Sequence, residues 1–193
     1  MKKALFLDRD GVINVNYGYV HKPETFEFID GIFDLVAAAK HAGYLVVVVT
    51  NQAGIGRGYY SEADFYSVTE WMKTKFTERG GQIDAVYFCP YHPKHGIGEY
   101  RRESDFRKPA PGMLLQAAQD LNIDLANSIF IGDKPSDMVA GKAAGVGTLL
   151  QLRDDKSEPS DVSSTLSISQ LKDALPYLRQ PMPPRNAHRV TDQ

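Results

Sequence analysis

Two carboxylates, Asp8 and Asp10, stand at the end of a short apolar run that begins at Ala4, and Gly11 follows them. The run has the length of a strand, so both acids are expected at the carboxyl end of a buried strand. Acids held there can bind a divalent cation, and a carboxylate can also act as a nucleophile toward phosphorus. A polar turn after the strand is the alternative explanation of an Asp-Gly pair.

Polar side chains follow a second apolar run in the same way. The valine-rich segment 45–49 leads into Thr50, Asn51 and Gln52. Their hydroxyl and amide groups, like the N–H groups of a turn, can donate to phosphate oxygens, although plain turn residues would look the same. The glycines that follow lack the spacing of a dinucleotide-binding fingerprint, and no Walker A pattern is present. A nucleotide cofactor is therefore not expected.

Two further segments carry charges suited to the same chemistry. Lys108 can neutralise charge on a phosphorylated aspartate, and Arg107 offers two parallel donors to a phosphate or to sugar hydroxyls. A solvated basic pair is the alternative for these two. The strand-like run 129–131 leads into Asp133, which can complete a magnesium site. Asp137 either orients that site or favours the N-terminus of the next helix through the helix dipole.

The segments between these residues alternate between strand-like and helix-like patterns. Strands are predicted over 5–7, 45–49, 83–88, 128–131 and 147–151. Apolar residues at helical spacing predict helices through 32–39, 65–76 and 114–121. Helix ends are indicated by a capping box of Ser61 with Asp64, by Pro111 in a first turn, and by Gly43 and Gly145 at C-terminal positions. The alternation predicts the α/β class, with a three-layer, Rossmann-like parallel sheet.

The same pattern predicts how the chain is divided. Residues 1–152 form one domain, and no second periodic block is large enough for a separate cap domain. Residues 153–179 are expected to be a loop and a last helix, over 166–178, that pack on this domain. Residues 180–193, which contain three prolines, are expected to form a flexible tail. The long loops 10–30 and 89–109 are expected to be functional.

Composition excludes several classes of protein. The 193 residues are 42% hydrophobic and 24% charged, as in ordinary globular proteins. A net charge of −2 and a pI near 6.2 argue against a nucleic-acid partner. Cys89 is the only cysteine, so the chain has no disulfide framework. The longest apolar run, 44–49, is too short to span a bilayer, and nothing at the start resembles a signal peptide, so a cytoplasmic protein is expected.

In this order, the four polar segments resemble the motifs of the haloacid-dehalogenase-like (HAD-like) superfamily: DxD, a Thr or Ser, a Lys, and a terminal acidic pair. The likeness covers about residues 3–150. It is closer still to one family, the D-glycero-D-manno-heptose-1,7-bisphosphate 7-phosphatases, which are related to histidinol-phosphate phosphatases. It rests on the stretches 6–14, 18–21, 26–31, 49–58, 107–114 and 131–134.

The resemblance implies a mechanism. Asp8 is the nucleophile, and Asp10 protonates the leaving sugar oxygen before it activates the hydrolytic water. Mg²⁺ is held by Asp8, by the backbone carbonyl of Asp10 and by Asp133. Thr50 and Lys108 stabilise the transferring phosphoryl group. The implied substrate-binding residues are Asn16, Tyr17, Gly18, Tyr19, Asn51, Gln52, Ala53, Arg107 and Lys134.

The resemblance also implies a substrate and a pathway. The family removes the 7-phosphate of heptose bisphosphate in the synthesis of nucleotide-activated heptose for lipopolysaccharide and other surface glycans. A monomer with no macromolecular partner is expected. Histidinol-phosphate phosphatase, or another small sugar-phosphate phosphatase, is the alternative enzyme, although segment 18–21 and Arg107 look closer to the heptose branch. A catalytically silent binding module would lack a catalytic group, and none is missing.

One family feature is altered in this chain. Many members bind a structural zinc in the loop after the third strand, through the spacings Cys-x-His and Cys-x-Cys. Cys89 matches the first ligand, but Tyr91, Ser104 and Phe106 replace the other three. His92 and His95 lie nearby without the family spacing. A closed tetrahedral zinc site is therefore not expected.

Overall fold

Six parallel strands form one sheet in the computed structural model, which describes residues 1–154 and 158–178. Their order is β3-β2-β1-β4-β5-β6, and every neighbouring pair runs parallel. The predicted α/β class and parallel sheet are confirmed, and the described residues contain no separate cap domain. The strands are β1 (Ala4–Leu7), β2 (Leu45–Asn51), β3 (Ala85–Cys89), β4 (Ile129–Gly132), β5 (Thr148–Leu152) and β6 (Thr165–Ile168).

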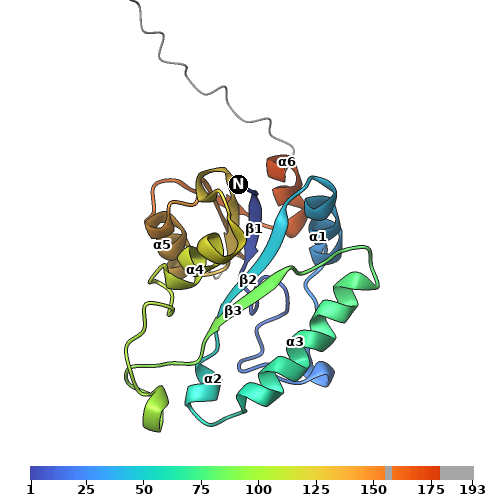
Figure 1. Cartoon of the computed structure of the whole chain (residues 1–193). Coiled ribbons are helices and arrows are strands. Elements are labelled where there is room, and N and C mark those ends of the chain that lie inside the picture. Colours follow the sequence, from blue (N-terminus) through green and yellow to red (C-terminus); the bar gives the residue numbers. More distant parts are fainter. Residues whose placement is uncertain (155–157, 179–193) are drawn as a thin grey trace, which may run out of the picture.

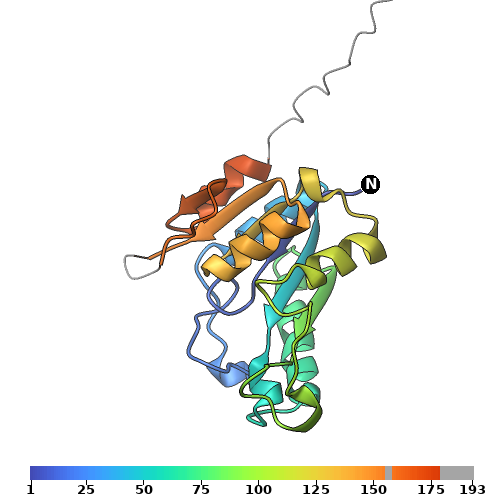
Figure 2. The same ribbon diagram turned by 90° about the vertical axis from the view of Figure 1, so that its left-hand side faces the viewer.

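Helices cover both faces of this sheet. Figures 1 and 2 show α1 and α3 on one face and α4 and α5 on the other. The helices are α1 (Ile32–His41), α2 (Ala53–Gly56), α3 (Glu62–Thr77), α4 (Gly112–Leu121), α5 (Pro135–Ala144) and α6 (Leu175–Leu178). Short 3₁₀ turns are η1 (Pro23–Thr25), η2 (Gly98–Tyr100), η3 (Leu125–Asn127) and η4 (Leu171–Ala174). No described helix is long and apolar enough to cross a bilayer.

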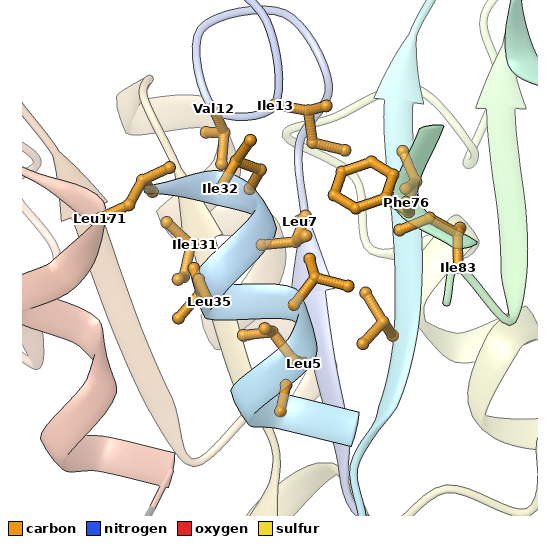
Figure 3. Packing of buried hydrophobic residues seen from close by; sticks show 14 of the residues in the cluster. Leu5, Leu7, Val12, Ile13, Ile32, Leu35, Phe76, Ile83, Ile131 and Leu171 are labelled. Carbon is orange, nitrogen blue, oxygen red and sulfur yellow. The ribbon is translucent and has the colours of Figure 1, made fainter. Parts of the chain in front are cut away.

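The central strand β1 is buried on both faces, because its side chains alternate between two cores. Leu5 and Leu7 pack with Ile32 and Leu35 of α1, and Phe76 of α3 joins the same cluster (Figure 3). Phe6 points the other way, into the cluster that α4 and α5 form with the sheet. These two apolar layers fix the end of β1, from which the first acidic segment leaves.

The strand order changes direction at β1, since β2 lies on one side of it and β4 on the other. In open α/β sheets such a switch point leaves a crevice at the carboxyl ends of the strands, where ligands bind. The long loops after β1 and β3 both start at this edge. Figure 1 shows it at the end of the molecule that carries α2, away from the N-terminus.

The helix ends predicted at Ser61, Gly43 and Gly145 agree with the structure, and the one predicted at Pro111 differs by one position. Ser61 accepts from the backbone N–H of Asp64, and the Asp64 side chain accepts from that of Ser61, so the capping box is complete. Gly145 is the C-cap of α5 with a φ of 83°, and Gly43 follows α1 with a φ of 81°. Pro111 lies at the N-cap of α4, one position before its first turn.

The prediction for the C-terminal segment is partly wrong. Residues 165–168 are strand β6, which pairs with β5 at the edge of the sheet, and not the first turn of a helix over 166–178. Helical structure starts only at Leu171, where Asp173 accepts from the N–H of Gln170. β-Branched Thr165 and Ile168 favour a strand, and β5 offers its edge to them. The predicted tail, 180–193, lies outside the described residues.

Candidate active site

A cavity of about 550 Å³ opens at the carboxyl ends of β1 and β2, and it brings the polar segments together. This size suits a small ligand. Its wall is formed by residues from the segments 8–19, 51–60, 107–108 and 134–137, together with His92. Of the predicted site residues, those that line it are Asp8, Asp10, Asn16, Gly18, Tyr19, Asn51, Gln52, Ala53, Arg107, Lys108 and Lys134.

Three predicted residues lie outside the wall of this cavity. Thr50 is buried directly behind it, and its hydroxyl oxygen accepts from Nε2 of Gln52 at 2.8 Å. Asp133 belongs to an acidic cluster beside Asp8 and lines a neighbouring cavity. Tyr17 is 62% exposed, and its hydroxyl donates to Glu27.

Lys108 is the central charge of the site. Its ammonium group lies 3.0 Å from Oδ1 of Asp8 and 2.7 Å from Oδ1 of Asp137, and it donates to the carbonyl oxygen of Val49 at 2.9 Å. The Lys108 side chain is only 3% exposed, and those of Asp8 and Asp137 are 7% and 1% exposed. Burial acts to lower the pKa of Lys108, but the charges of Asp137 and Asp8 outweigh it and raise that pKa. The lysine is therefore a permanent cation.

The structure answers the question left open for Asp137. Its Oδ1 contacts Lys108, and its Oδ2 accepts from the backbone N–H of Lys134 at the start of α5. Asp137 thus both holds the site lysine and caps the helix. It forms an ion pair toward the site and accepts a backbone hydrogen bond at the start of the helix, so neither explanation excludes the other.

Asp8, Asp133 and Asp137 form an acidic cluster whose ligand atoms all lie within 4.8 Å of one another. One lysine contacts this cluster, so negative charge remains. Burial, and then nearby carboxylates, raise the pKa of Asp133 to about 7, and burial raises the pKa of Asp8 to about 6 against the lowering effect of Lys108. Oδ1 of Asp133 is buried and has no hydrogen-bond partner within the described part of the chain. Hard carboxylate oxygens with this unmatched charge fit a Mg²⁺ ion.

Gly11 allows this cluster to form. Its φ is +94°, which residues with a side chain rarely adopt, and a Cβ there would lie 2.3 Å from Oδ2 of Asp133. Both the backbone turn after β1 and the approach of Asp133 therefore require glycine. From the sequence, a polar turn was the alternative explanation of the Asp10-Gly11 pair. The structure has this turn, and the turn also makes room for the carboxylate of Asp133.

Asp10 is held by three donors. Oδ1 accepts from Nη2 of Arg9 at 2.9 Å and from Nδ2 of Asn14 at 3.0 Å, and Oδ2 accepts from Nε2 of Gln52 at 3.0 Å. Arg9 is itself 2% exposed and lies between the rings of Phe26 and Phe65. The Asp10 side chain is 17% exposed, so the carboxylate has a fixed orientation but still reaches the cavity.

Asn51 holds the backbone of Lys108. Its Oδ1 accepts from the Lys108 N–H and its Nδ2 donates to the Lys108 carbonyl, both at 3.1 Å. This pair of hydrogen bonds joins the end of β2 to the loop that follows β3. Sequence reasoning assigned Asn51 to substrate binding, and the geometry adds a structural task to that assignment.

Sequence reasoning missed several residues of the cavity wall, namely Gly54, Arg57, Tyr60, His92 and Ser136. Arg57 is the missed residue that says most about the ligand. Among the described residues its buried Nε has no hydrogen-bond partner, and its guanidinium forms no ion pair with a carboxylate. The position of Arg57, a cation in a glycine-rich segment after β2, could have marked it in the sequence as a candidate site residue. Burial, and the charges of Arg107, His95 and Arg57, lower the pKa of His92, so cationic groups gather on this side of the cavity.

In the loop after β3, Cys89 and the residues at the three replaced ligand positions make other contacts. Sγ of buried Cys89 lies 4.0 Å from the carbonyl oxygen of Tyr91, and burial raises the pKa of its thiol. The guanidinium of Arg102 stacks 3.9 Å from the centre of the Tyr91 ring. The Ser104 hydroxyl accepts from the N–H of Phe106 at 3.2 Å. All three replaced ligand positions thus take part in packing or hydrogen bonds.

Comparison with known sequences gives consistent matches over nearly the whole chain. A HAD-hydrolase-like family model matches residues 105–174. D-glycero-alpha-D-manno-heptose-1,7-bisphosphate 7-phosphatase of Burkholderia mallei is 54% identical over 181 residues, which are 94% of this chain and 96% of the relative. D-glycero-beta-D-manno-heptose-1,7-bisphosphate 7-phosphatase of Vibrio cholerae is 50% identical, over 92% of this chain and 96% of the relative.

Solved structures give the same result. D,D-heptose 1,7-bisphosphate phosphatase from B. bronchiseptica, crystallised with magnesium and phosphate, matches with a TM-score of 0.77 and 27% identity, over 91% of this chain and 97% of that one. D,D-heptose 1,7-bisphosphate phosphatase from Burkholderia thailandensis matches with a TM-score of 0.65 and 31% identity, over 93% of this chain and 100% of that one.

Proposed function

Because the chain belongs to the D-glycero-D-manno-heptose-1,7-bisphosphate 7-phosphatase family of HAD-like phosphatases, we propose that it hydrolyses the 7-phosphate of D-glycero-D-manno-heptose 1,7-bisphosphate with Mg²⁺. The arrangement about Lys108 carries the proposal. A buried ammonium group bridges Asp8 and Asp137, with Asp133 beside them and Asp10 at the cavity. This arrangement supports attack by a carboxylate on a phosphate ester whose negative charge the lysine compensates.

The reaction has two steps, and both are assigned to residues of this chain. In the first, an oxygen of Asp8 attacks phosphorus, the bond from phosphorus to the sugar oxygen breaks, and Asp10 gives its proton to that oxygen. In the second, water attacks phosphorus, Asp10 takes a proton from the water, and the bond from phosphorus to Asp8 breaks. Lys108 and Thr50 are assigned to stabilising the phosphoryl group in both steps. Free phosphate and the dephosphorylated sugar are the products.

A bound Mg²⁺ would neutralise charge between the nucleophile and the phosphate that it attacks. Asp8 and Asp133, with the backbone carbonyl of Asp10, would hold it. The unpartnered Oδ1 of Asp133 and the excess of carboxylates over cations support this assignment. A solved relative that contains magnesium and phosphate supports it independently.

Arg57 and Arg107 favour a bisphosphate over histidinol phosphate. Both guanidinium groups line the cavity, and among the described residues neither has a carboxylate partner. Two cations that the described residues leave without a carboxylate partner attract a second phosphate and repel the ammonium group of histidinol phosphate. The structure thus supports the heptose branch more strongly than the sequence alone does.

This function suits a monomeric cytoplasmic enzyme that acts on a small molecule in the synthesis of nucleotide-activated heptose. The relatives carry both the alpha and the beta names, so the family does not decide which anomer this enzyme prefers. The absence of three zinc ligands supports activity without zinc.

The test is phosphate release, with Mg²⁺, from the alpha and beta anomers of heptose 1,7-bisphosphate and from histidinol phosphate. We expect a strong preference for one heptose anomer, which also decides between the lipopolysaccharide route and the route to other glycans. Equal, weak activity on all three would contradict the substrate assignment. Removal of Mg²⁺ with EDTA should stop the enzyme, and Mg²⁺ without zinc should restore it.

A further inference from the structure

Asp10 is held more firmly on one oxygen than on the other. Oδ1 accepts from both Arg9 and Asn14, whereas among the residues that the structure describes Oδ2 accepts only from Nε2 of Gln52. A carboxylate oxygen offers two lone pairs, so Oδ1 is fully used. A proton carried by Asp10 therefore belongs on Oδ2, and Gln52 is the side chain that fixes the position of this oxygen.

The Gln52 amide is held by hydrogen bonds on both its NH₂ group and its carbonyl oxygen. Nε2 donates one hydrogen to Asp10 and the other to Oγ1 of Thr50, and Oε1 accepts from the Tyr60 hydroxyl at 2.5 Å. An ionised carboxylate can only accept, so the NH₂ edge must face Asp10. The Tyr60 hydroxyl supplies the donor that the opposite edge needs. Gln52 is 2% exposed, so bulk water cannot easily replace this partner.

Tyr60 is fixed in place. It is 7% exposed, and its ring stacks on His21 with a centroid separation of 4.8 Å and an interplanar angle of 4°. Gly54 makes room for the ring, because a Cβ at that position would lie 2.2 Å from Cε1 of Tyr60. Burial raises the pKa of Tyr60 to about 12, so its hydroxyl keeps the proton that it donates.

We propose that Tyr60 and Gln52 are positioning residues for proton transfer to the leaving group. Tyr60 orients the Gln52 amide, and the amide holds Oδ2 of Asp10 where its proton meets the leaving sugar oxygen. Neither side chain gains or loses a proton in this step. The inference rests on the proposed role of Asp10 as the acid, and it assigns Tyr60, which sequence reasoning missed, a task in the reaction.

The test compares substrates that differ in their need for a proton. A sugar alkoxide must be protonated as it leaves, whereas the nitrophenolate of p-nitrophenyl phosphate leaves unaided. Tyr60→Phe should therefore lower kcat for the sugar phosphate about tenfold and leave its KM unchanged. Nitrophenolate release in a single turnover should stay within about twofold of the wild-type rate. An equal loss on both substrates, or a rise in KM alone, would overturn the proposal.

Two further variants separate positioning from a structural role. Tyr87→Phe is the matched control. The Tyr87 hydroxyl donates to Asp120 of α4 at 2.9 Å and Tyr87 does not line the cavity, so this variant should leave both rates unchanged. Gln52→Met removes the amide while keeping its size. If Tyr60 acts through Gln52, adding Tyr60→Phe to Gln52→Met should cause no further loss. If the losses in kcat of the two single variants multiply in the double variant, Tyr60 does not act through Gln52 and the proposal is contradicted.

The test does not depend on the assigned sugar. Failure of the wild-type enzyme on heptose bisphosphate would contradict the proposed function. The comparison of Tyr60→Phe with wild type can still be made on any alkyl phosphate that the wild-type enzyme hydrolyses. The deciding quantity is the loss of rate that Tyr60→Phe causes on the alkyl phosphate, divided by the loss that it causes on p-nitrophenyl phosphate.

Discussion

Lys108 compensates part of the negative charge of the carboxylates in the site. The position of its backbone depends on Asn51, which carries no charge. The ammonium group bridges Asp8 and Asp137, while Asn51 binds the Lys108 backbone on both its N–H and its carbonyl. A lysine shifted by a fraction of an ångström would still form ion pairs but would meet the phosphoryl oxygens less well. We therefore expect Asn51 to influence the reaction through the position of Lys108, without needing to contact the substrate.

Replacing Asn51 tests this point. We expect Asn51→Ala to lower kcat about tenfold with little change in KM, because the loop that carries Lys108 loses two hydrogen bonds. Steady-state kinetics with the preferred heptose bisphosphate measure both constants. A raised KM with an unchanged kcat would instead make Asn51 a simple substrate contact.

Arg57 is the residue on which the second phosphate can be tested. Arg57→Met should raise KM for the bisphosphate about tenfold, the loss expected for one charge-assisted hydrogen bond, and leave KM for the heptose 7-monophosphate nearly unchanged. Arg79→Met is the control, since Arg79 stacks on Phe33 outside the cavity wall. Equal effects of Arg57→Met on both substrates would remove the argument for a bisphosphate.

At the scale of elements, the site depends on turns as much as on strands. The turn after β1 needs the positive φ of Gly11, and the turn after β4 brings Asp133 against that glycine. The two strands are neighbours in the sheet, with Leu7 paired to Ile131, so their turns meet. Two segments more than 120 residues apart in the sequence are joined by this contact.

Gly11→Ala should disturb this junction. We expect roughly 1–3 kcal/mol lower stability from backbone strain, together with a loss of Mg²⁺-dependent activity as Asp133 is displaced. Gly43→Ala is the matched control, because Gly43 has a φ of +81° and nothing within 4 Å of a Cβ. It should lose comparable stability and keep its activity. Thermal unfolding and phosphate release measure the two effects, and full activity of Gly11→Ala would contradict this account of the turn.

Sequence patterns predicted the inner elements well and the outer ones less well. The apolar runs 5–7 and 45–49 are buried on both faces, so their pattern is continuous and strong. Strand β6 lies at the edge, with Leu166 and Ser167 exposed, and its short polar sequence carries no such pattern. Pairing with β5 decides its structure, and this partner cannot be read from residues 165–168 alone.

For the whole molecule, the uneven distribution of charge matters more than the net charge of −2. Carboxylates gather beside β1 and β4, whereas Arg57, Arg107 and His92 line the same cavity and lie close enough for their charges to interact. The carboxylates were predicted from the sequence because they belong to recognisable motifs. Of the other three residues, Arg107 was predicted from its motif, whereas Arg57 and His92 were missed because the segment after β2 and the loop after β3 meet only in the folded chain.

The acidic cluster predicts how Mg²⁺ stabilises the protein. Folding raises the pKa of Asp8 to about 6 and that of Asp133 to about 7, so without metal the stability from these groups is present at low pH and is lost as pH rises through about 4 to 7. Mg²⁺ binds the ionised carboxylates. It should therefore raise the melting temperature more near pH 8 than near pH 5. An equal shift at both pH values, or a shift that persists in Asp133→Asn, would contradict the assigned site.

The most direct test of the mechanism is to trap the phosphorylated enzyme during turnover. The wild-type protein is mixed with heptose 1,7-bisphosphate and Mg²⁺, quenched in acid within the first turnover and digested for mass spectrometry. We predict one added phosphoryl group on the peptide that contains Asp8, absent from Asp8→Asn, and nearly abolished turnover in both Asp8→Asn and Asp10→Asn with the fold intact. Substantial activity of Asp8→Asn, or a phosphoryl group on another residue, would contradict the assignment of Asp8 as the nucleophile.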